Sequence, residues 1–224
     1  MQTGWYKGAT TEIAMQLLPQ SMLSPDELAR FFREFRSHRT PRCTLRPLGM
    51  QDLEPFFQCE SDPEMFRYEI HPPLQHIDEA RALIRGWEAR RARGVTAPFS
   101  VILTEEDRWI GSCDFGEVSP DYHYVAVGFS IIRSHWGQGL ATEVLRGLLT
   151  IAFETLGCYR VEGNCAVDHT ASGRVMEKVG MQREGILRGK LPVRDVHHDL
   201  QYYAMLRDEY PRWRERWRSL GQAT

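Results

Sequence analysis

The chain has 224 residues, of which 42% are hydrophobic and 26% charged, and its 28 basic residues are balanced by 30 acidic ones. This composition is typical of a globular protein, and the balanced charge argues against a nucleic-acid partner. The sequence contains no run of about 18 apolar residues, so no membrane partner is expected. Five scattered cysteines without a Cys-x-x-Cys pair favour a reducing compartment. Because residues 1–8 also lack the apolar stretch of a signal peptide, we expect a cytoplasmic protein.

The N-terminal region predicts a helix that must dock on another surface. Ser24 is suited to the N-cap and Glu27 completes a capping box, with a proline between them at the first helical position. An apolar stripe follows, formed by Leu28, Phe31, Phe32 and Phe35. This helix could pack within the chain, form a homodimer contact or act as a lid over a substrate cleft. We divide the chain into an N-terminal helical extension (1–42), a main domain (43–210) and a C-terminal helix (211–224).

The first part of the main domain alternates a strand with helices. Residues 44–48 read as a short edge strand that ends at its proline, and residues 52–57 carry apolar residues at helical spacing. Ser61-Asp62-Pro63-Glu64 predicts the start of another short helix, carrying Met65, Phe66 and Tyr68. Residues 77–93 predict a longer helix that ends in a run of arginines.

Strands dominate the middle of the chain. Residues 99–103 and 109–113 predict a hairpin, and residues 124–132 a third strand. After an intervening helix, residues 159–167 predict a strand that follows a parallel crossover. A helix within residues 168–180 is followed by two further predicted strands, residues 181–188 and 198–206. Trp213, Trp217 and Leu220 give the C-terminal helix an apolar edge, which we expect to pack on the domain, with a subunit contact as the alternative.

The stretch between the third strand and the following helix predicts an anion-binding turn. Gly137 and Gly139 let the backbone approach a ligand closely, and the first turn of the helix presents N–H groups without intrahelical partners. A phosphate or pyrophosphate is the ligand that we expect on this turn. The alternative is a tight strand-to-helix turn that binds nothing, since a Gly-x-Gly before a helix is a weak signal by itself.

Trp136-x-x-Gly139-x-Ala141 is similar to the acetyl-CoA cradle of the GCN5-related N-acetyltransferase (GNAT) superfamily, written Gln/Arg-x-x-Gly-x-Gly/Ala. The sequence from Trp136 to Glu143 resembles the motif of the RimJ/RimL-type branch, whose members acetylate the N-termini of ribosomal proteins. Ser172, the run 177–181 and Glu184-Gly185 also resemble a second signature of this branch. His169 replaces the asparagine of this signature. Met176 stands where some relatives carry a tyrosine that acts as the general acid.

The resemblance implies a GNAT acyl-CoA acyltransferase fold of the α/β (α+β) class, with a central mixed, mostly antiparallel sheet flanked by helices. It implies acetyl-CoA as cofactor, with the pyrophosphate on the glycine turn and the pantetheine arm along the preceding strand. The backbone N–H near Ile131 is expected to stabilise the oxyanion. The cofactor-binding residues implied are Phe129, Ile131, Ile132, Trp136, Gly137, Gln138, Gly139, Leu140, Ala141, Thr142, His169 and Ser172. No metal site is expected, because the neighbours His197 and His198 point to opposite faces of a strand.

The proton-transfer groups are less clear from the sequence. No carboxylate lies along residues 124–128, so Asp114 and Glu117, on or just after the preceding strand, are the nearest candidates for a base. A solvated turn carboxylate is the alternative for each. Ser172, at the start of its helix, could cap the helix or donate a proton to the leaving thiolate. His169 could relay a proton, cap its helix or contact the cofactor adenine.

We expect an N-acetyltransferase that transfers the acetyl group of acetyl-CoA to a primary amine by direct attack in a ternary complex. By resemblance, the expected acceptor is a protein or peptide N-terminal α-amine. The weak base machinery also favours an α-amine, because its pKa of about 7.7 to 8.0 demands a weaker base than a lysine. A small-molecule amine such as a polyamine, an amino acid or an aminoglycoside is the nearest alternative. A catalytically silent acyl-CoA-binding module and an assembly protein built on the terminal helices remain as other classes.

Overall fold

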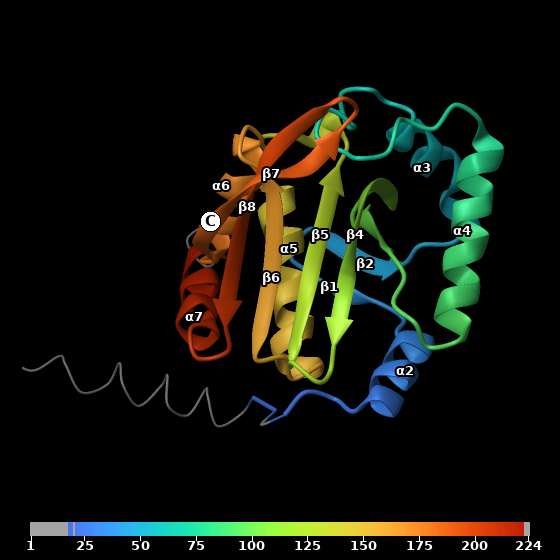
Figure 1. The fold of residues 1–224 in the computed structure, drawn as a ribbon. Coiled ribbons are helices and arrows are strands. Elements are labelled where there is room, and N and C mark those ends of the chain that lie inside the picture. The colour runs from blue at the N-terminus through green and yellow to red at the C-terminus, as the bar shows by residue number, and fades with distance from the viewer. Residues whose placement is uncertain (1–17, 20, 222–224) are drawn as a thin grey trace, which may run out of the picture.

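A computed structural model describes residues 18–19 and 21–221 and centres on one eight-stranded sheet (Figure 1). The strand order is β1-β2-β3-β4-β5-β6-β8-β7. Only β5 and β6 pair in parallel, so the sheet is mixed and mostly antiparallel, as predicted. The strands are β1 (His38–Arg39), β2 (Cys43–Pro47), β3 (Phe99–Leu103), β4 (Arg108–Ser119), β5 (Tyr124–Ile131), β6 (Arg160–Ala166), β7 (Gln182–Val193) and β8 (Val196–Leu206).

Helices cover both faces of the sheet. In the described residues the α-helices are α2 (Pro25–Glu34), α3 (Leu53–Glu60), α4 (Ile77–Ala92), α5 (Leu140–Thr150), α6 (Thr170–Val179) and α7 (Tyr210–Gly221). Figure 1 shows α5 behind the strands, and α3 and α4 at the right-hand side of the view. None of these helices in the described ranges is long and apolar enough to cross a membrane.

Strand alternation divides the buried side chains into two cores. On β3, Phe99 and Val101 join the larger core, which contains the apolar face of α5. Ile102, the residue after Val101, points to the other face and joins Trp109 in a smaller core under α3 and α4. Both faces of the sheet are therefore covered.

The helix α2 packs on the domain. Ser24 and Glu27 form the predicted capping box, with the Ser24 N–H donating to Glu27 Oε2 at 2.9 Å. Leu28 and Phe32 are each 4% exposed, and the Phe35 ring lies 4.8 Å from the ring of Phe99. Packing within the chain is thus the reading that the structure shows. Residues 1–17 and 20 of the predicted extension lie outside the described residues.

The helix α7 also packs as predicted. Trp217 is buried, and its ring lies 5.8 Å from that of Tyr210. The Trp213 ring covers Gly180, where a β-carbon would come within 2.2 Å of it. Gly180 ends α6 in a left-handed conformation, with a φ of +99°. The side chain of Leu220 lies outside the described residues.

One predicted helix is wrong. Residues 63–68 form consecutive turns rather than the short helix expected after Ser61. Asp62 does not act as a simple helix cap: its Oδ1 accepts from the Glu64 N–H, while its Oδ2 accepts from Arg133 Nε at 2.8 Å. This ion pair, made with a residue 71 positions away, fixes the segment by tertiary contact. The two-residue strand β1 was not predicted either.

The strands β5 and β6 separate along their length. They pair only between residues 124–126 and 160–162, after which no ladder joins them. The remainder of β5, from Val127 to Ile131, keeps its antiparallel ladder with β4. A gap therefore opens beside the second half of β5, at the end from which the chain turns into α5.

Candidate active site

The glycine turn between β5 and α5 forms a cradle of N–H groups. Gly137 and Gly139 both adopt left-handed conformations, with φ of +75° and +77°, which side chains other than glycine rarely tolerate. The first N–H bonded within the helix is that of Glu143, 3.1 Å from the Gly139 oxygen. The N–H groups of residues 140–142 precede the helical ladder and lie at the positive end of the helix dipole. The cradle therefore fits a phosphate or pyrophosphate.

Side chains of the turn fasten it to the end of β5. The indole Nε1 of Trp136 donates to the Ile131 oxygen at 2.5 Å, while the rest of this side chain is 54% exposed. The Gln138 amide donates back to the Ser134 oxygen at 3.3 Å. Because the Gln138 side chain points back along the turn, the backbone is what the turn offers to an anion.

The open edge of β5 presents backbone groups that no neighbouring strand pairs with, although the Ile131 oxygen on this edge accepts from Trp136. The Ile132 N–H donates to the Ile110 oxygen at 2.9 Å, so this pair faces β4. In an antiparallel ladder the orientation alternates, which directs the backbone groups of Phe129 and Ile131 to the opposite edge, toward the gap. Of the three strand residues predicted to hold the cofactor, Phe129 and Ile131 therefore line the gap. The N–H of Ile132 is already used within the sheet.

Asp114 lies on the face of the sheet that α3 and α4 cover. It pairs with Gly128 across β4 and β5, and both of its carboxylate oxygens lie 3.1 Å from the position of a β-carbon on Gly128. Its neighbours Cys113 and Phe115 point to the other face, into the larger core. Burial raises the pKa of Asp114. Among the described residues no hydrogen bond or ion pair occupies its carboxylate, which leaves the group available to a ligand.

Two further carboxylates affect the same region. Burial raises the pKa of Glu60, at the end of α3, to about 7, and the negative charge of Glu69 adds to this effect. Burial also raises the pKa of Glu69; the positive charge of His71 opposes this shift and the negative charge of Asp114 strengthens it. The three carboxylates thus share one electrostatic environment on the side of α3, and a cationic group placed there would be favoured.

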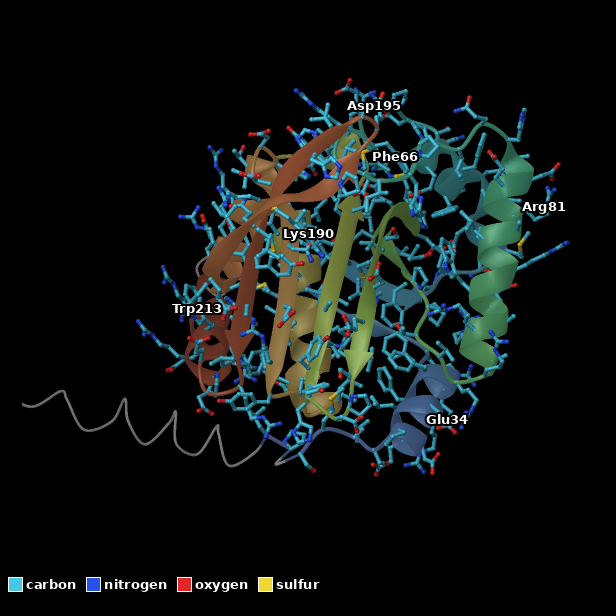
Figure 2. The ribbon with its side chains drawn as sticks, viewed as in Figure 1. Glu34, Phe66, Arg81, Lys190, Asp195 and Trp213 are labelled. Carbon is cyan, nitrogen blue, oxygen red and sulfur yellow. The ribbon has the colours of Figure 1, made fainter. Side chains whose placement is uncertain are left out.

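The segment between α3 and α4 closes this side of the gap. It leaves α3 at Glu60, whose oxygen accepts from the Leu74 N–H at 2.9 Å where the segment returns. At its middle, the Tyr68 hydroxyl donates to the Asp168 oxygen at 3.2 Å, and the Tyr68 ring stacks on His169 with centroids 4.8 Å apart. Figure 2 shows Phe66 of this segment and Asp195, from the tip of the β7–β8 hairpin, at the same end of the molecule.

His169 and Ser172 lie at the start of α6, beyond the end of β6. Burial lowers the pKa of His169, which favours the neutral imidazole near pH 7. No side-chain bond caps this helix at His169. The Ser172 hydroxyl lies near the Cys165 thiol and lowers the pKa of that thiol, against the larger raising effect of burial. Ser172 therefore lies beside the β6 wall of the gap, where a hydroxyl could meet a thiol group.

Several residues around the site have no local signature in the sequence. Arg42 and Thr40 bind Glu143 in the first turn of α5, although about a hundred residues separate the partners. Tyr68 and Glu69 lie in a segment whose predicted helix does not form. Glu117, in contrast to Asp114, is exposed and accepts a bond from the Tyr124 hydroxyl, away from the gap.

A strand-glycine turn-helix cradle beside two diverging strands is matched by a known family. The acetyltransferase (GNAT) domain matches residues 42–182, which is more than half of the chain. The chain belongs to the GNAT acetyltransferase family. It is an N-acetyltransferase, and enzymes of this family use acetyl-CoA. When bound, acetyl-CoA supplies an activated acetyl thioester, and the N–H cradle described above fits its pyrophosphate.

Individual GNAT proteins support the same assignment. The uncharacterized N-acetyltransferase p20 of Bacillus licheniformis is 29% identical over 171 residues, covering 76% of this chain and 96% of p20. The ribosomal-protein-serine acetyltransferase of Escherichia coli is 26% identical over 135 residues, covering 60% of this chain and 74% of that protein. A GNAT-family acetyltransferase from Bacillus anthracis, with a solved structure, superposes with a TM-score of 0.70 at 25% identity, covering 77% and 99% of the two chains.

Proposed function

We propose that this chain acetylates the N-terminal α-amine of a protein or peptide, by direct attack of the amine on acetyl-CoA in a ternary complex. The observation that carries the proposal is the Asp114 carboxylate, half-buried over Gly128 and beside the open edge of β5, with no partner among the described residues. An acceptor amine that enters from the side of α3 meets this carboxylate before it reaches the gap.

Asp114 is proposed to bind the acceptor ammonium and to take its proton. Burial raises the pKa of this carboxyl, which brings it closer to that of an α-ammonium, about 7.7 to 8.0. A lysine ammonium, with a pKa of about 10.4, holds its proton more tightly by roughly 3 kcal/mol, at 1.36 kcal/mol for each pKa unit. A single buried carboxylate is therefore a better match for an α-amine than for a lysine side chain.

Groups on the two sides of the gap stabilise the negative charges that develop during the reaction. The N–H of Ile131, directed to the open edge of β5, would donate to the oxyanion as charge develops on the thioester oxygen. The Ser172 hydroxyl, which lies near the Cys165 thiol, would donate to the thiolate of the leaving coenzyme A. Trp136, Gly137, Gln138, Gly139 and residues 140–142 would hold the pyrophosphate through the turn.

The similarity to the E. coli ribosomal-protein-serine acetyltransferase supports a protein N-terminus as acceptor. One structural observation favours a second candidate. Glu60 and Glu69 place further negative charge near Asp114, an arrangement that would also attract a small amine carrying several positive charges, such as a polyamine. The two candidates differ in the number of charges on the acceptor.

Thiol release from acetyl-CoA, followed with a panel of acceptors, separates these candidates. The panel contains short peptides beginning with serine or alanine, the same peptides blocked at the N-terminus, polyamines, amino acids and aminoglycosides. The proposal predicts release with the free peptides and none with the blocked ones. Release with polyamines alone would replace the peptide with a small cation as acceptor.

The Gly139→Val variant tests the cradle itself. At a φ of +77° a β-branched side chain is strained, so the turn must deform and coenzyme A binding should be lost. If the protein is an enzyme or a silent acyl-CoA-binding module, coenzyme A binding is lost in this variant. The unmodified protein separates these two cases, because only an enzyme releases thiol in the presence of an amine. A role limited to assembly through the terminal helices predicts no change in either measurement.

A further inference from the structure

An ion pair from outside the glycine turn reaches the pyrophosphate cradle. Arg42, just before β2, donates from Nε to Glu143 Oε2 at 2.7 Å and from its backbone N–H to Glu143 Oε1 at 2.6 Å. Thr40 adds a third bond, from Oγ1 to Glu143 Oε1 at 2.6 Å. The loop before β2 is thereby fastened to the first turn of α5.

The carboxylate of Glu143 is charged in this setting. Burial alone would raise its pKa, but the bonds from Thr40 and Arg42, together with the positive charge of Arg42, hold the pKa of Glu143 below its usual value. An ionised carboxylate this close to the start of α5 would repel a phosphate. Arg146, one turn along α5, also faces Glu143, but its guanidinium lies over the Trp217 ring instead of toward the glycine turn.

The remaining guanidinium nitrogens of Arg42 point along the glycine turn. Nη1 donates to the Gln138 oxygen at 3.0 Å, and Nη2 lies 3.7 Å from the position of a β-carbon on Gly139. The Arg42 side chain is 48% exposed, so it remains accessible to a ligand on the turn. The guanidinium is thus held in place by two hydrogen bonds. Its Nη2 is a further donor, beside the N–H groups at the start of α5.

We propose that Arg42 is a phosphate-binding residue of the acetyl-CoA site, whose Nη2 contacts the pyrophosphate held by residues 138–142. Arg42 thus has two effects on one anion: it neutralises the buried Glu143 and adds a positive charge beside the cradle. A guanidinium suits this task because it can bind a carboxylate and a phosphate at the same time with different nitrogens.

Equilibrium binding measured by calorimetry tests the proposal without relying on activity. The ligands are coenzyme A, dephospho-coenzyme A, which retains the pyrophosphate, and pantetheine, which lacks phosphate. Arg42→Gln should weaken binding of the first two ligands by about tenfold, the size of one charge-assisted hydrogen bond, and leave pantetheine unchanged. Arg42→Lys should recover part of the loss. An equal loss for pantetheine, or no loss for the pyrophosphate ligands, would overturn the proposal.

Two variants separate the charge of Arg42 from its role in fastening Glu143. Thr40→Val removes a bond to the same carboxylate and keeps the guanidinium, so it should lower the melting temperature but change coenzyme A affinity by less than about twofold. Glu143→Gln removes the repelling charge and should bind coenzyme A at least as tightly as the unmodified protein. If both variants instead weaken binding as Arg42→Gln does, Arg42 acts only by fastening the helix, and the proposal is wrong.

Discussion

The carboxylate of Asp114 occupies the space over Gly128 that a side chain would otherwise fill. Both carboxylate oxygens lie 3.1 Å from the position of a β-carbon on that glycine, which faces Asp114 across the β4–β5 ladder. The half-buried acid and the glycine opposite it place a carboxylate next to the open edge of β5. The proposed chemistry depends on this pairing.

Asp114→Asn is expected to lower kcat/KM by roughly a hundredfold or more, the typical contribution of a general base. Because burial raises the pKa of Asp114, kcat/KM of the unmodified enzyme should rise with pH as this carboxyl loses its proton, and the variant should lack that rise. The measurement is kcat/KM against pH, with coenzyme A affinity as a check on the cofactor site. Glu117→Gln, an exposed acid on the same strand, serves as the control.

Gly128→Ala is expected to reduce kcat by several-fold to about tenfold, since the carboxylate must move by a few tenths of an ångström and a displacement of about 1 Å in a reacting group can cost about a hundredfold. The added methyl group would lie 3.1 Å from the Asp114 carboxylate and push it aside. Gly116→Ala is the matched control, because its methyl group would meet the same carboxylate at an ordinary 3.5 Å. Similar rates for the two variants would contradict a role for the position of Asp114.

Ser172→Ala is expected to lower kcat by about tenfold or more while coenzyme A affinity stays within a few-fold, since the hydroxyl is proposed to act on the thiolate as it departs. Single-turnover measurements isolate this step from product release. Thr170→Ala, at the first position of the same helix, controls for changes in helix stability. A loss of affinity without a loss of kcat would assign Ser172 to cofactor binding alone.

Glu60→Gln is expected to stabilise the protein above neutral pH. Burial and the charge of Glu69 raise the pKa of Glu60 from 4.5 to about 7, so its stabilising contribution is present below pH 4.5 and is lost as pH rises through 7. Urea unfolding at pH 4 and pH 8 should show a gain on the order of 2 kcal/mol at pH 8 and little or none at pH 4. Glu54→Gln, an exposed acid on the same helix, should show no gain, and equal curves for Glu60→Gln and the unmodified protein would contradict the account.

Local sequence signals predicted most of the fold. The capping box at Ser24 and Glu27, the glycine that ends α6 and the alternating strands are each determined by a few neighbouring residues, and all of them form. The helix predicted after Ser61 does not form: the segment makes successive turns, and Asp62 is engaged by Arg133 of the turn before α5. A contact between residues so far apart in the chain has no local signature.

The glycine turn on the cofactor side of the site was similarly accessible to sequence reasoning, and the acceptor side was not; that this turn holds coenzyme A stays a prediction. Two glycines before an apolar helix identify a cradle, because its N–H groups come from consecutive residues. The groups around the acceptor come instead from β4, α3 and the segment carrying Tyr68, and only tertiary packing brings them together. For the same reason the stacking of His169 on Tyr68, and the bond from Arg42 to Glu143, could not be predicted.

The most direct test of the account is mass spectrometry of a serine-initial peptide incubated with the protein and acetyl-CoA, beside its N-terminally blocked counterpart. The account predicts one acetyl group on the N-terminus of the free peptide, none on the blocked one, and loss of the product in Asp114→Asn. Unmodified peptides, together with binding of coenzyme A and no thiol release with any amine, would contradict it and leave an acyl-CoA-binding module.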